Sequence, residues 1–257
     1  MNILAIGDVV GAPGCEMLRR RLPGLKKFYG VDLCVVNGEN SAEGNGITPQ
    51  SLDNILNAGA DVVTTGNHGL RRREVYDRFE DGYTPLLRPD NYGTRAPGSG
   101  LYVFHKGRHR IAVINLIGTM YLTGGDNPFD AADRLLERTQ DCRIRLVDFH
   151  AEATSEKLAL AHYLDGRVTA VFGTHTHVQT SDARVLPGGT GYITDLGMTG
   201  PEHSILGVAA DVVIARMRDN LQERFRTADG PCKLNGCVFT VDDATGKTMN
   251  AEAVEIR

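Results

Sequence analysis

Five apolar segments of the chain each lead directly into polar side chains of the kinds that bind metal ions. Carboxylate, carboxamide and imidazole groups without cysteine suit divalent ions such as Fe, Mn, Zn, Co or Ni. Seven such ligands are too many for one four-coordinate zinc ion, so the set predicts two ions that share a bridging ligand. The candidate metal ligands are Asp8, Glu39, Asn40, Asn67, His150, His175 and His177.

Most of these residues also have an ordinary structural explanation when each is considered alone. Asp8 could cap the helix that follows it, and Asn67 could form a turn. His150 could be a hydrogen-bonded histidine at the edge of the core. His175 and His177 are more informative, because alternate residues of an extended segment point the same way. The coincidence of five segment ends favours metal binding over these separate explanations.

Two divalent ions held close together have a well-defined chemistry. At a separation of about 3.5–4 Å they can activate a water molecule and bind both the attacking and the leaving oxygen of a phosphoryl group. The candidate ligands therefore predict hydrolysis of a phosphoester, with metal-activated water as the nucleophile.

The ligands can meet only if the segments that carry them are strands ending at a common edge. Short β-branched runs alternate with amphipathic stretches along the first two-thirds of the chain, which is typical of α/β proteins with buried, mainly parallel strands. In such sheets, ligands bind at the carboxyl ends of the strands. We expect strands at 3–6, 31–36, 60–65, 144–149 and 168–172, and helices at 17–28, 52–56, 128–138 and 156–163.

The middle and the C-terminal part of the chain add paired strands to this alternation. Residues 98–105 and 109–116 predict a hairpin, and 236–241 and 251–256 predict further strands. We therefore expect an α/β fold in which a sandwich of two mixed β-sheets is flanked by α-helices. No repeat or linker divides the sequence, so residues 1–257 predict a single domain, with 85–97 as a long surface excursion.

The composition is that of a soluble protein in a reducing compartment. Lys and Arg number 28 against 32 Asp and Glu, and the net charge of -4 argues against a protein that coats nucleic acid. No apolar run reaches the roughly 18 residues of a membrane helix, and the first residues lack the pattern of a signal peptide. Five scattered cysteines, an odd number, favour a cytoplasmic location over a disulfide framework.

The order of the polar motifs resembles that of the calcineurin-type metallophosphoesterase superfamily. That superfamily has an Asp after the first strand, an acidic block, Gly-Asn-His, a lone His and Gly-His-x-His. The corresponding segments here are Gly7–Asp8, Gly38–Asn40, Gly66–His68, His150 and Gly173–His177. The resemblance extends from residue 3 to about residue 197, and it implies the metallophosphoesterase-type sandwich for the single domain.

Two departures narrow the resemblance to one subfamily. Val10 stands where the superfamily usually has the His of Asp-x-His, and Glu39 followed by Asn40 replaces the usual Gly-Asp-x-x-Asp. These features, together with the segments Gly7–Gly11 and Val147–Lys157, resemble the sequences of a small bacterial subfamily. Its members are cytoplasmic two-metal phosphodiesterases that act on 2′,3′-cyclic nucleotides.

The resemblance implies a role for each matched residue. Glu39 would bridge two divalent ions per chain, with Fe or Mn favoured and Zn, Co or Ni as alternatives. His68 would be the catalytic residue, acting near the leaving oxygen as a general acid or as a stabiliser of developing charge. A homo-oligomer is also implied. The remaining ligands would be Asp8, Asn40 and His177 for the first ion, and Asn67, His150 and His175 for the second.

The segment after His68 departs from the subfamily. An aromatic residue and an acid usually stand there, whereas this chain has Gly69–Leu70–Arg71 followed by two more arginines. An acid could orient His68, so its absence leaves the orientation of that ring open. We expect Arg71–Arg73 to form a solvated helix face, with attraction of phosphate or RNA as the second interpretation.

Other reactive side chains have structural explanations that we prefer. Glu152, Glu156 and Lys157 lie at a predicted helix start, so helix capping and surface charge are expected of them. Cys232 and Cys237 lack two further nearby ligands, and we expect structural thiols rather than a zinc site.

The sequence thus predicts an enzyme, a dinuclear-metal phosphodiesterase that hydrolyses 2′,3′-cyclic nucleotides or related phosphodiesters. Two alternatives stay open, because ligands alone do not establish turnover. One is a regulatory or RNA-interacting metal-binding protein with little turnover, and the other is a phosphomonoesterase or nucleotidase. The expected partners are a small phosphodiester substrate, with RNA as a further option and no membrane.

Overall fold

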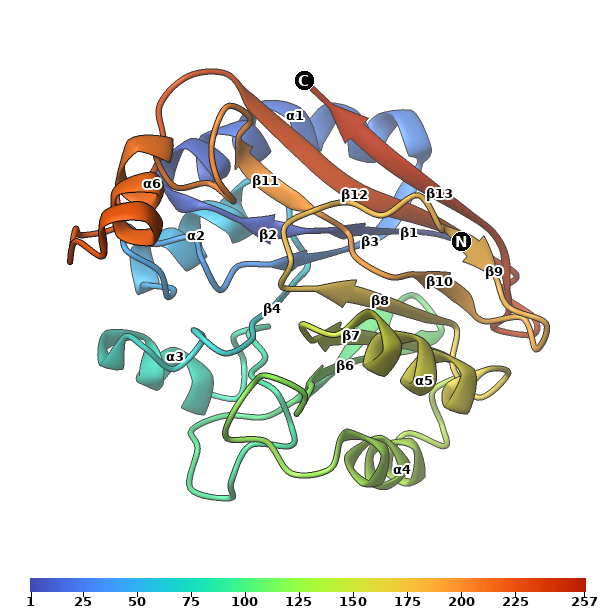
Figure 1. Ribbon diagram of the computed structural model, residues 1–257. Coiled ribbons are helices and arrows are strands. Elements are labelled where there is room, and N and C mark those ends of the chain that lie inside the picture. Colours follow the sequence, from blue (N-terminus) through green and yellow to red (C-terminus); the bar gives the residue numbers. More distant parts are fainter.

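Two β-sheets lie face to face in the computed structural model, which describes residues 1–257, and helices cover both outer faces (Figure 1). Both sheets contain parallel and antiparallel pairs of strands, so the predicted sandwich of two mixed sheets flanked by helices is confirmed. No helix in the chain has the length and apolar character needed to cross a lipid bilayer.

The first sheet has seven strands. Their order is β2 (Asp8–Val9), β11 (Met198–Pro201), β12 (Cys232–Val241), β1 (Asn2–Ile6), β3 (Val31–Asn37) and β4 (Val62–Thr64), and β13 (Thr248–Ile256) pairs with β12. Strands β1, β3 and β4 are parallel neighbours, whereas β12 runs antiparallel to β1. The parallel strands therefore end together at one edge.

The second sheet has six strands. Their order is β5 (Leu101–Lys106), β6 (His109–Ile117), β7 (Ile144–His150), β8 (Ala170–Thr174), β10 (Gly191–Ile193) and β9 (Arg184–Val185). The predicted hairpin is confirmed, since β5 and β6 pair in the antiparallel direction. Strands β6, β7, β8 and β10 are parallel to one another.

Helices pack on the outer faces through apolar side chains. The first sheet is covered by α1 (Gly11–Tyr29) and α2 (Pro49–Asn57), and the second by α4 (Pro128–Arg138) and α5 (Thr154–Leu164). The 3-10 turn η1 (Arg73–Val75), α3 (Tyr76–Glu80) and α6 (Ala210–Asp219) complete the set. Helices α3 and α6 lie at the end of the sandwich toward which β8 points (Figure 1).

Local sequence explains where two of the helices begin. Thr48 accepts a hydrogen bond from the Ser51 amide at 3.1 Å, and Pro49 occupies the first turn of α2. At α4, the Asn127 side chain accepts from the Phe129 amide at 2.9 Å, and a proline again follows the cap. These caps satisfy amide donors that have no partner inside the helix.

The space between the sheets changes from apolar to polar along the parallel strands. Ile3, Leu33, Leu146 and Phe172 belong to the apolar layer that both sheets share. Because strand residues alternate between faces, the later inward positions can be followed along the same strands. These positions carry buried polar side chains, namely Asn37, Thr64, Asp148 and Thr174. The sandwich thus ends in a buried polar layer directly before the candidate ligands.

The prediction that residues 85–97 form a surface excursion is wrong for much of that segment. Leu86, Leu87, Arg88 and Asn91 are buried. The Asn91 side chain exchanges hydrogen bonds with the backbone of Ile117 at 2.7 and 2.9 Å, in the way that a neighbouring strand would. Backbone bonds also hold the segment, since the Val63 amide donates to the Pro85 carbonyl at 2.7 Å and the Leu87 amide donates to the Val63 carbonyl at 2.8 Å.

Candidate metal centre

All seven predicted ligands meet at the polar end of the sandwich, and none lies elsewhere. Each follows or ends a strand of the parallel set: Asp8 after β1, Glu39 and Asn40 after β3, Asn67 after β4, His150 at the end of β7, and His175 and His177 after β8. Both sheets therefore contribute. The carboxyl ends of parallel strands place these side chains at one rim, as expected for α/β sheets.

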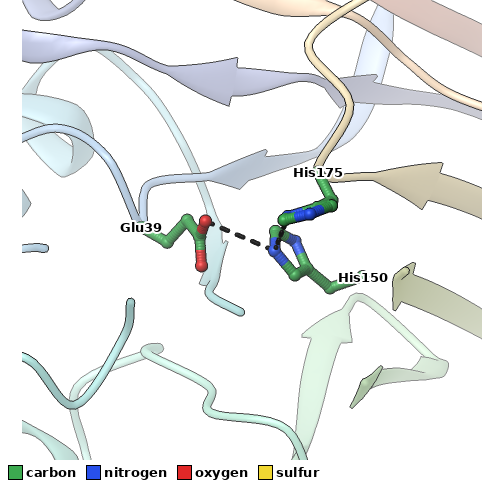
Figure 2. Close-up of side chains that lie close together, drawn as sticks. All are labelled: Glu39, His150 and His175. Atoms are coloured by element: carbon green, nitrogen blue, oxygen red, sulfur yellow. Dashed lines mark hydrogen bonds and ion pairs between the residues drawn. The ribbon is translucent and has the colours of Figure 1, made fainter. Parts of the chain in front are cut away.

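One group of donor atoms surrounds the His150 ring. Figure 2 shows Glu39, His150 and His175 turned toward one another. The Nε2 atom of His150 lies 3.3 Å from a Glu39 carboxylate oxygen and 3.0 Å from His175 Nδ1. Asn67 Oδ1 lies 2.9 Å from the same nitrogen. Two imidazoles, a carboxylate and a carboxamide oxygen therefore converge, which is a donor set for one divalent ion.

A second group of donor atoms adjoins the first through Glu39. His177 Nε2 lies 3.6 Å from Asp8 Oδ1 and 3.2 Å from the Asn40 carboxamide. The Asn40 side chain also contacts Glu39 Oε1 at 3.0 Å. Asp8 is fully buried, and its Oδ1 atom has no hydrogen-bond partner. Because an unpaired buried carboxylate oxygen is costly, this atom fits a metal-ligand role.

The electrostatics of the centre favour bound cations. Burial alone would raise the pKa of Glu39, but the His150 and His68 rings hold it well below its usual range. Burial alone would lower the pKa of His177, but the Asp8 carboxylate raises it to about 9. The buried carboxylates thus raise the pKa of the His150 and His177 rings, whereas burial and the neighbouring His150 lower the pKa of His175. Divalent ions could supply the same positive charge in their place.

A hydrogen-bonded chain fixes which nitrogen of His150 faces the centre. Thr174 donates to an Asp148 oxygen at 2.7 Å, so its hydroxyl oxygen is left to accept. His150 Nδ1 lies 2.9 Å from that oxygen and must therefore be the protonated nitrogen. The lone pair of Nε2 then points at the other donor atoms. Carboxylate support of this kind orients metal-binding histidines in many proteins.

The other two histidines are oriented in the same manner. His177 Nδ1 donates to the Leu206 carbonyl at 3.0 Å, which leaves Nε2 free to bind a cation. His175 Nε2 lies 3.0 Å from the Glu152 carboxylate, which leaves Nδ1 facing His150. Glu152 was expected to cap a helix or carry surface charge. Its side chain is half-exposed but supports a candidate ligand, and α5 begins after Ala153 without a side-chain cap.

His175 and His177 converge through a turn, so the expectation of an extended segment is wrong. Their φ angles are 103° and 64°, in the left-handed region that non-glycine residues rarely adopt. Two carboxylates hold this conformation through the backbone. Asp8 accepts from the His175 amide at 3.1 Å, and Asp195 accepts from the Thr176 amide at 3.1 Å.

Asp195 is itself held by a buried cation. Lys157 Nζ lies 2.7 Å from its carboxylate, and both side chains are about 1% exposed. Surface charge was expected of Lys157 and of Glu156, and both expectations are wrong. Glu156 is also buried and accepts from the amides of Thr119 and Met120. The partner of Lys157 lies 38 positions away in the sequence, and the amides that bind Glu156 lie 36 and 37 positions away.

His68 lies beside the ligands with one ring nitrogen available. Its Nδ1 atom is 2.9 Å from Asn40 Oδ1 and 3.4 Å from Glu39, and its amide donates to Glu39 at 3.1 Å. The side chain is 25% exposed. These contacts orient the ring without the acid that the subfamily usually has after Gly-Asn-His.

The arginines after Leu70 do not form one solvated face. Arg71 and Arg73 are exposed, but Arg72 is half-buried and donates to the backbone carbonyls of Glu43 and Asn45. Arg72 thereby ties the segment after His68 to the loop after Asn40. The prediction of solvent-exposed side chains is therefore correct for Arg71 and Arg73 and wrong for Arg72.

Sequence reasoning missed several supporting residues, although a signal existed for some. Asp148 precedes His150 by two positions in a strand and so shares its face. Asp195 follows the apolar run of β10, as the candidate ligands follow theirs. No local pattern identified Arg72. The five cysteines are free thiols, and burial raises the pKa of Cys237 to about 12.

The amino-acid sequence of this chain is similar to those of known proteins. The sequence model of the YmdB-like protein family matches residues 4–254. The 2′,3′-cyclic-nucleotide 2′-phosphodiesterase of Bacillus subtilis is 46% identical over 257 residues, which cover 100% of this chain and 97% of the relative.

Two solved structures have closely similar folds. A crystal structure of a hypothetical protein from Thermus thermophilus superposes with a TM-score of 0.94 at 40% identity, covering 100% of this chain and 99% of that one. A novel phosphatase from Mycoplasma pneumoniae also has a TM-score of 0.94, at 35% identity, covering 100% of this chain and 93% of that one.

Proposed function

Because this chain belongs to the YmdB-like protein family, we propose that it hydrolyses 2′,3′-cyclic nucleotides or related phosphodiesters at a centre of two divalent ions. One observation carries this proposal. Seven side chains with oxygen and nitrogen donors from both sheets meet at one rim, one of them, Asp8, has a buried carboxylate oxygen without a hydrogen-bond partner, and His68 lies directly beside the set. The relative from B. subtilis is named for the same reaction.

The ligands divide into two sets in this proposal. Glu39 would help to hold both ions, because its carboxylate contacts residues of each set. The first set adds Asp8, Asn40 and His177, and the second adds Asn67, His150 and His175. When bound, two divalent ions supply an activated water nucleophile and neutralise charge on the phosphoryl oxygens. The mixed donors without thiolate suit Fe, Mn, Zn, Co or Ni, and among these Fe or Mn are the ions that we propose.

His68 is the proposed catalytic residue. Its Nδ1 atom is occupied by Asn40, so Nε2 is the nitrogen that can face a substrate. In the protonated ring, Nε2–H donates a hydrogen bond or a proton to the departing ribose oxygen. Asn40 and Glu39 hold the ring in place while this occurs.

A comparison of substrates tests the proposed function. Purified protein with its metals is assayed on 2′,3′-cyclic AMP, on AMP and on a bis-aryl phosphodiester. We expect metal-dependent hydrolysis of the two diesters, slower hydrolysis of AMP, and loss of both activity and metal in Glu39→Gln. A faster rate on AMP would identify a phosphomonoesterase, and a fully loaded but inactive protein would identify a metal-binding regulator.

Three broader properties belong to the same proposal. Residues 1–257 act as one metallophosphoesterase domain, a view supported by ligands that come from both sheets. The protein works in the cytoplasm, which five free cysteines support.

It forms a homo-oligomer, which the exposed apolar side chains of Ile214, Met217 and Leu221 support. Sedimentation of the metal-loaded protein tests the last point.

A further inference from the structure

A polar cavity of about 710 Å³ lies next to the candidate metal centre. It is bounded by the loop after Asn40, by the N-terminal half of α2 and by the segment that follows α6. Hydroxyl and amide side chains line it, including Ser41, Thr48 and Gln50. None of the seven candidate ligands lines it, so the cavity is separate from the centre.

A smaller cavity borders both the candidate ligands and this large cavity. The ligands Asn40 and His177 line a small cavity of about 30 Å³. The small and large cavities share Ala42, Gly44 and Phe225 as walls. The shared walls place the large cavity beside the candidate ligands, on the side of Asn40 and His177.

The lining of the large cavity combines cationic and aromatic side chains. Arg72 and Arg224 line it, against Glu43 as the one carboxylate. Arg72 is anchored by its bonds to the carbonyls of Glu43 and Asn45, whereas the Arg224 side chain is exposed. Phe225 lines the same cavity, and the Arg216 guanidinium lies 4.3 Å from the centre of its ring. Arginines interleaved with an aromatic ring are typical of sites that bind single-stranded nucleic acid.

The chemistry of a 2′,3′-cyclic phosphate restricts where a larger substrate can extend. Both the 2′ and the 3′ oxygens are occupied by the cyclic ester, so further nucleotides can be attached only through the 5′ oxygen. A nucleotide on that side brings one phosphate and one base. The cavity offers guanidinium groups for the phosphate and the Phe225 ring for the base, in a volume that is ordinary for a nucleotide-sized ligand.

We propose that this cavity binds the nucleotide that precedes the cyclic phosphate, so that the preferred substrate is a short oligoribonucleotide ending in a 2′,3′-cyclic phosphate. This inference rests on the proposed function and adds to it the class of substrate. Arg224 contacts the phosphate between the two nucleotides, and Phe225 stacks on the preceding base.

Chain-length preference tests the inference. The value of kcat/KM is measured for 2′,3′-cyclic AMP and for the adenosine dinucleotide that ends in a 2′,3′-cyclic phosphate. We expect the dinucleotide to be preferred by roughly tenfold, and Arg224→Ala to remove most of that preference. The matched control is Arg218→Ala, because Arg218 is exposed on α6 and does not line the cavity. It should leave the ratio of the two values unchanged. Equal values for both substrates in the wild-type protein would overturn the inference.

A binding measurement separates this inference from the proposed function. Fluorescence anisotropy of a labelled tetra-adenylate reports occupation of the cavity without turnover. We expect Arg224→Ala to weaken binding roughly fivefold to tenfold and to lower its salt dependence, with no change in Arg218→Ala. If the wild-type protein hydrolyses neither substrate, the proposed function fails and the anisotropy result alone decides the inference. Equal affinity of wild type and Arg224→Ala would overturn it.

Discussion

The Nδ1 atom of His68 lies 2.9 Å from the side-chain oxygen of Asn40. This contact links the proposed catalytic residue to a proposed metal ligand, since Asn40 also reaches Glu39 and His177. Removal of His68 should therefore spare the metals but slow the chemistry. We expect His68→Ala to retain two ions per chain and to lower kcat on 2′,3′-cyclic AMP by roughly 10²–10⁴-fold.

The control for this prediction is His162→Ala, because His162 is exposed on α5. It should keep the wild-type rate and metal content. Full turnover in His68→Ala with both metals present would show that His68 has no catalytic role.

Gly66 leaves the space that the His150 ring occupies. A methyl group at Gly66 would lie 2.2 Å from a carbon of that ring, so Gly66→Ala must displace His150. We expect this variant to lose about 1–3 kcal/mol of unfolding free energy and to bind less metal. Gly93→Ala is the control, since a methyl group there meets nothing within 4 Å. Elemental analysis and urea unfolding of both variants measure the effect. Normal metal content in Gly66→Ala would contradict the placement of His150.

The buried pair of Lys157 and Asp195 should be far more sensitive to substitution than an exposed pair. Lys157→Met removes one charge and leaves the other buried, which we expect to cost about 3–5 kcal/mol of unfolding free energy. Arg167→Met breaks an exposed pair with Asp133, where both side chains are 41% exposed, and should cost less than about 1 kcal/mol. Equal effects of the two substitutions in urea unfolding would show that Lys157 is not needed to hold the turn.

The contribution of Asp182 to stability should depend on pH. Burial raises the pKa of this carboxyl group, but hydrogen bonds from the Thr194 and Thr180 side chains outweigh burial and lower it below its usual value. The resulting stability is present above the unfolded-state pKa and is lost as the pH falls through the lower folded-state pKa. We expect Asp182→Asn to cost about 0.5–1 kcal/mol at neutral pH, a small value because the group is partly exposed. Urea unfolding near pH 3 should give nearly equal stabilities, and a constant difference at all pH values would contradict this account.

The sequence alone allowed the fold and the convergence of the candidate ligands to be predicted, because both depend on local patterns. Each apolar strand and the polar residue after it are adjacent in the chain, so the rim of the sheet could be inferred from five short segments. The supporting contacts could not be inferred in this way. Lys157 and Asp195 are 38 positions apart, and nothing near Lys157 marks it as buried.

Contacts between residues that are distant in the sequence also explain why two other predictions were wrong. Residues 85–97 have the composition of a surface loop, yet Asn91 satisfies buried backbone groups that lie 26 positions away. His175 and His177 have the spacing of an extended pair, but Asp8 and Asp195 hold them in a left-handed turn. Long-range hydrogen bonds decided each of these cases, and they leave no trace in local periodicity.

Metal content and activity measured on one sample test the central claim most directly. The protein is purified without oxygen, analysed for its elements, and assayed at once on 2′,3′-cyclic AMP. We expect two divalent ions per chain, chiefly Fe or Mn, and hydrolysis that is lost together with the metals in Glu39→Gln. Hydrolysis by a sample that contains no metal, or no hydrolysis by a sample that contains two ions per chain, would contradict a dinuclear phosphodiesterase.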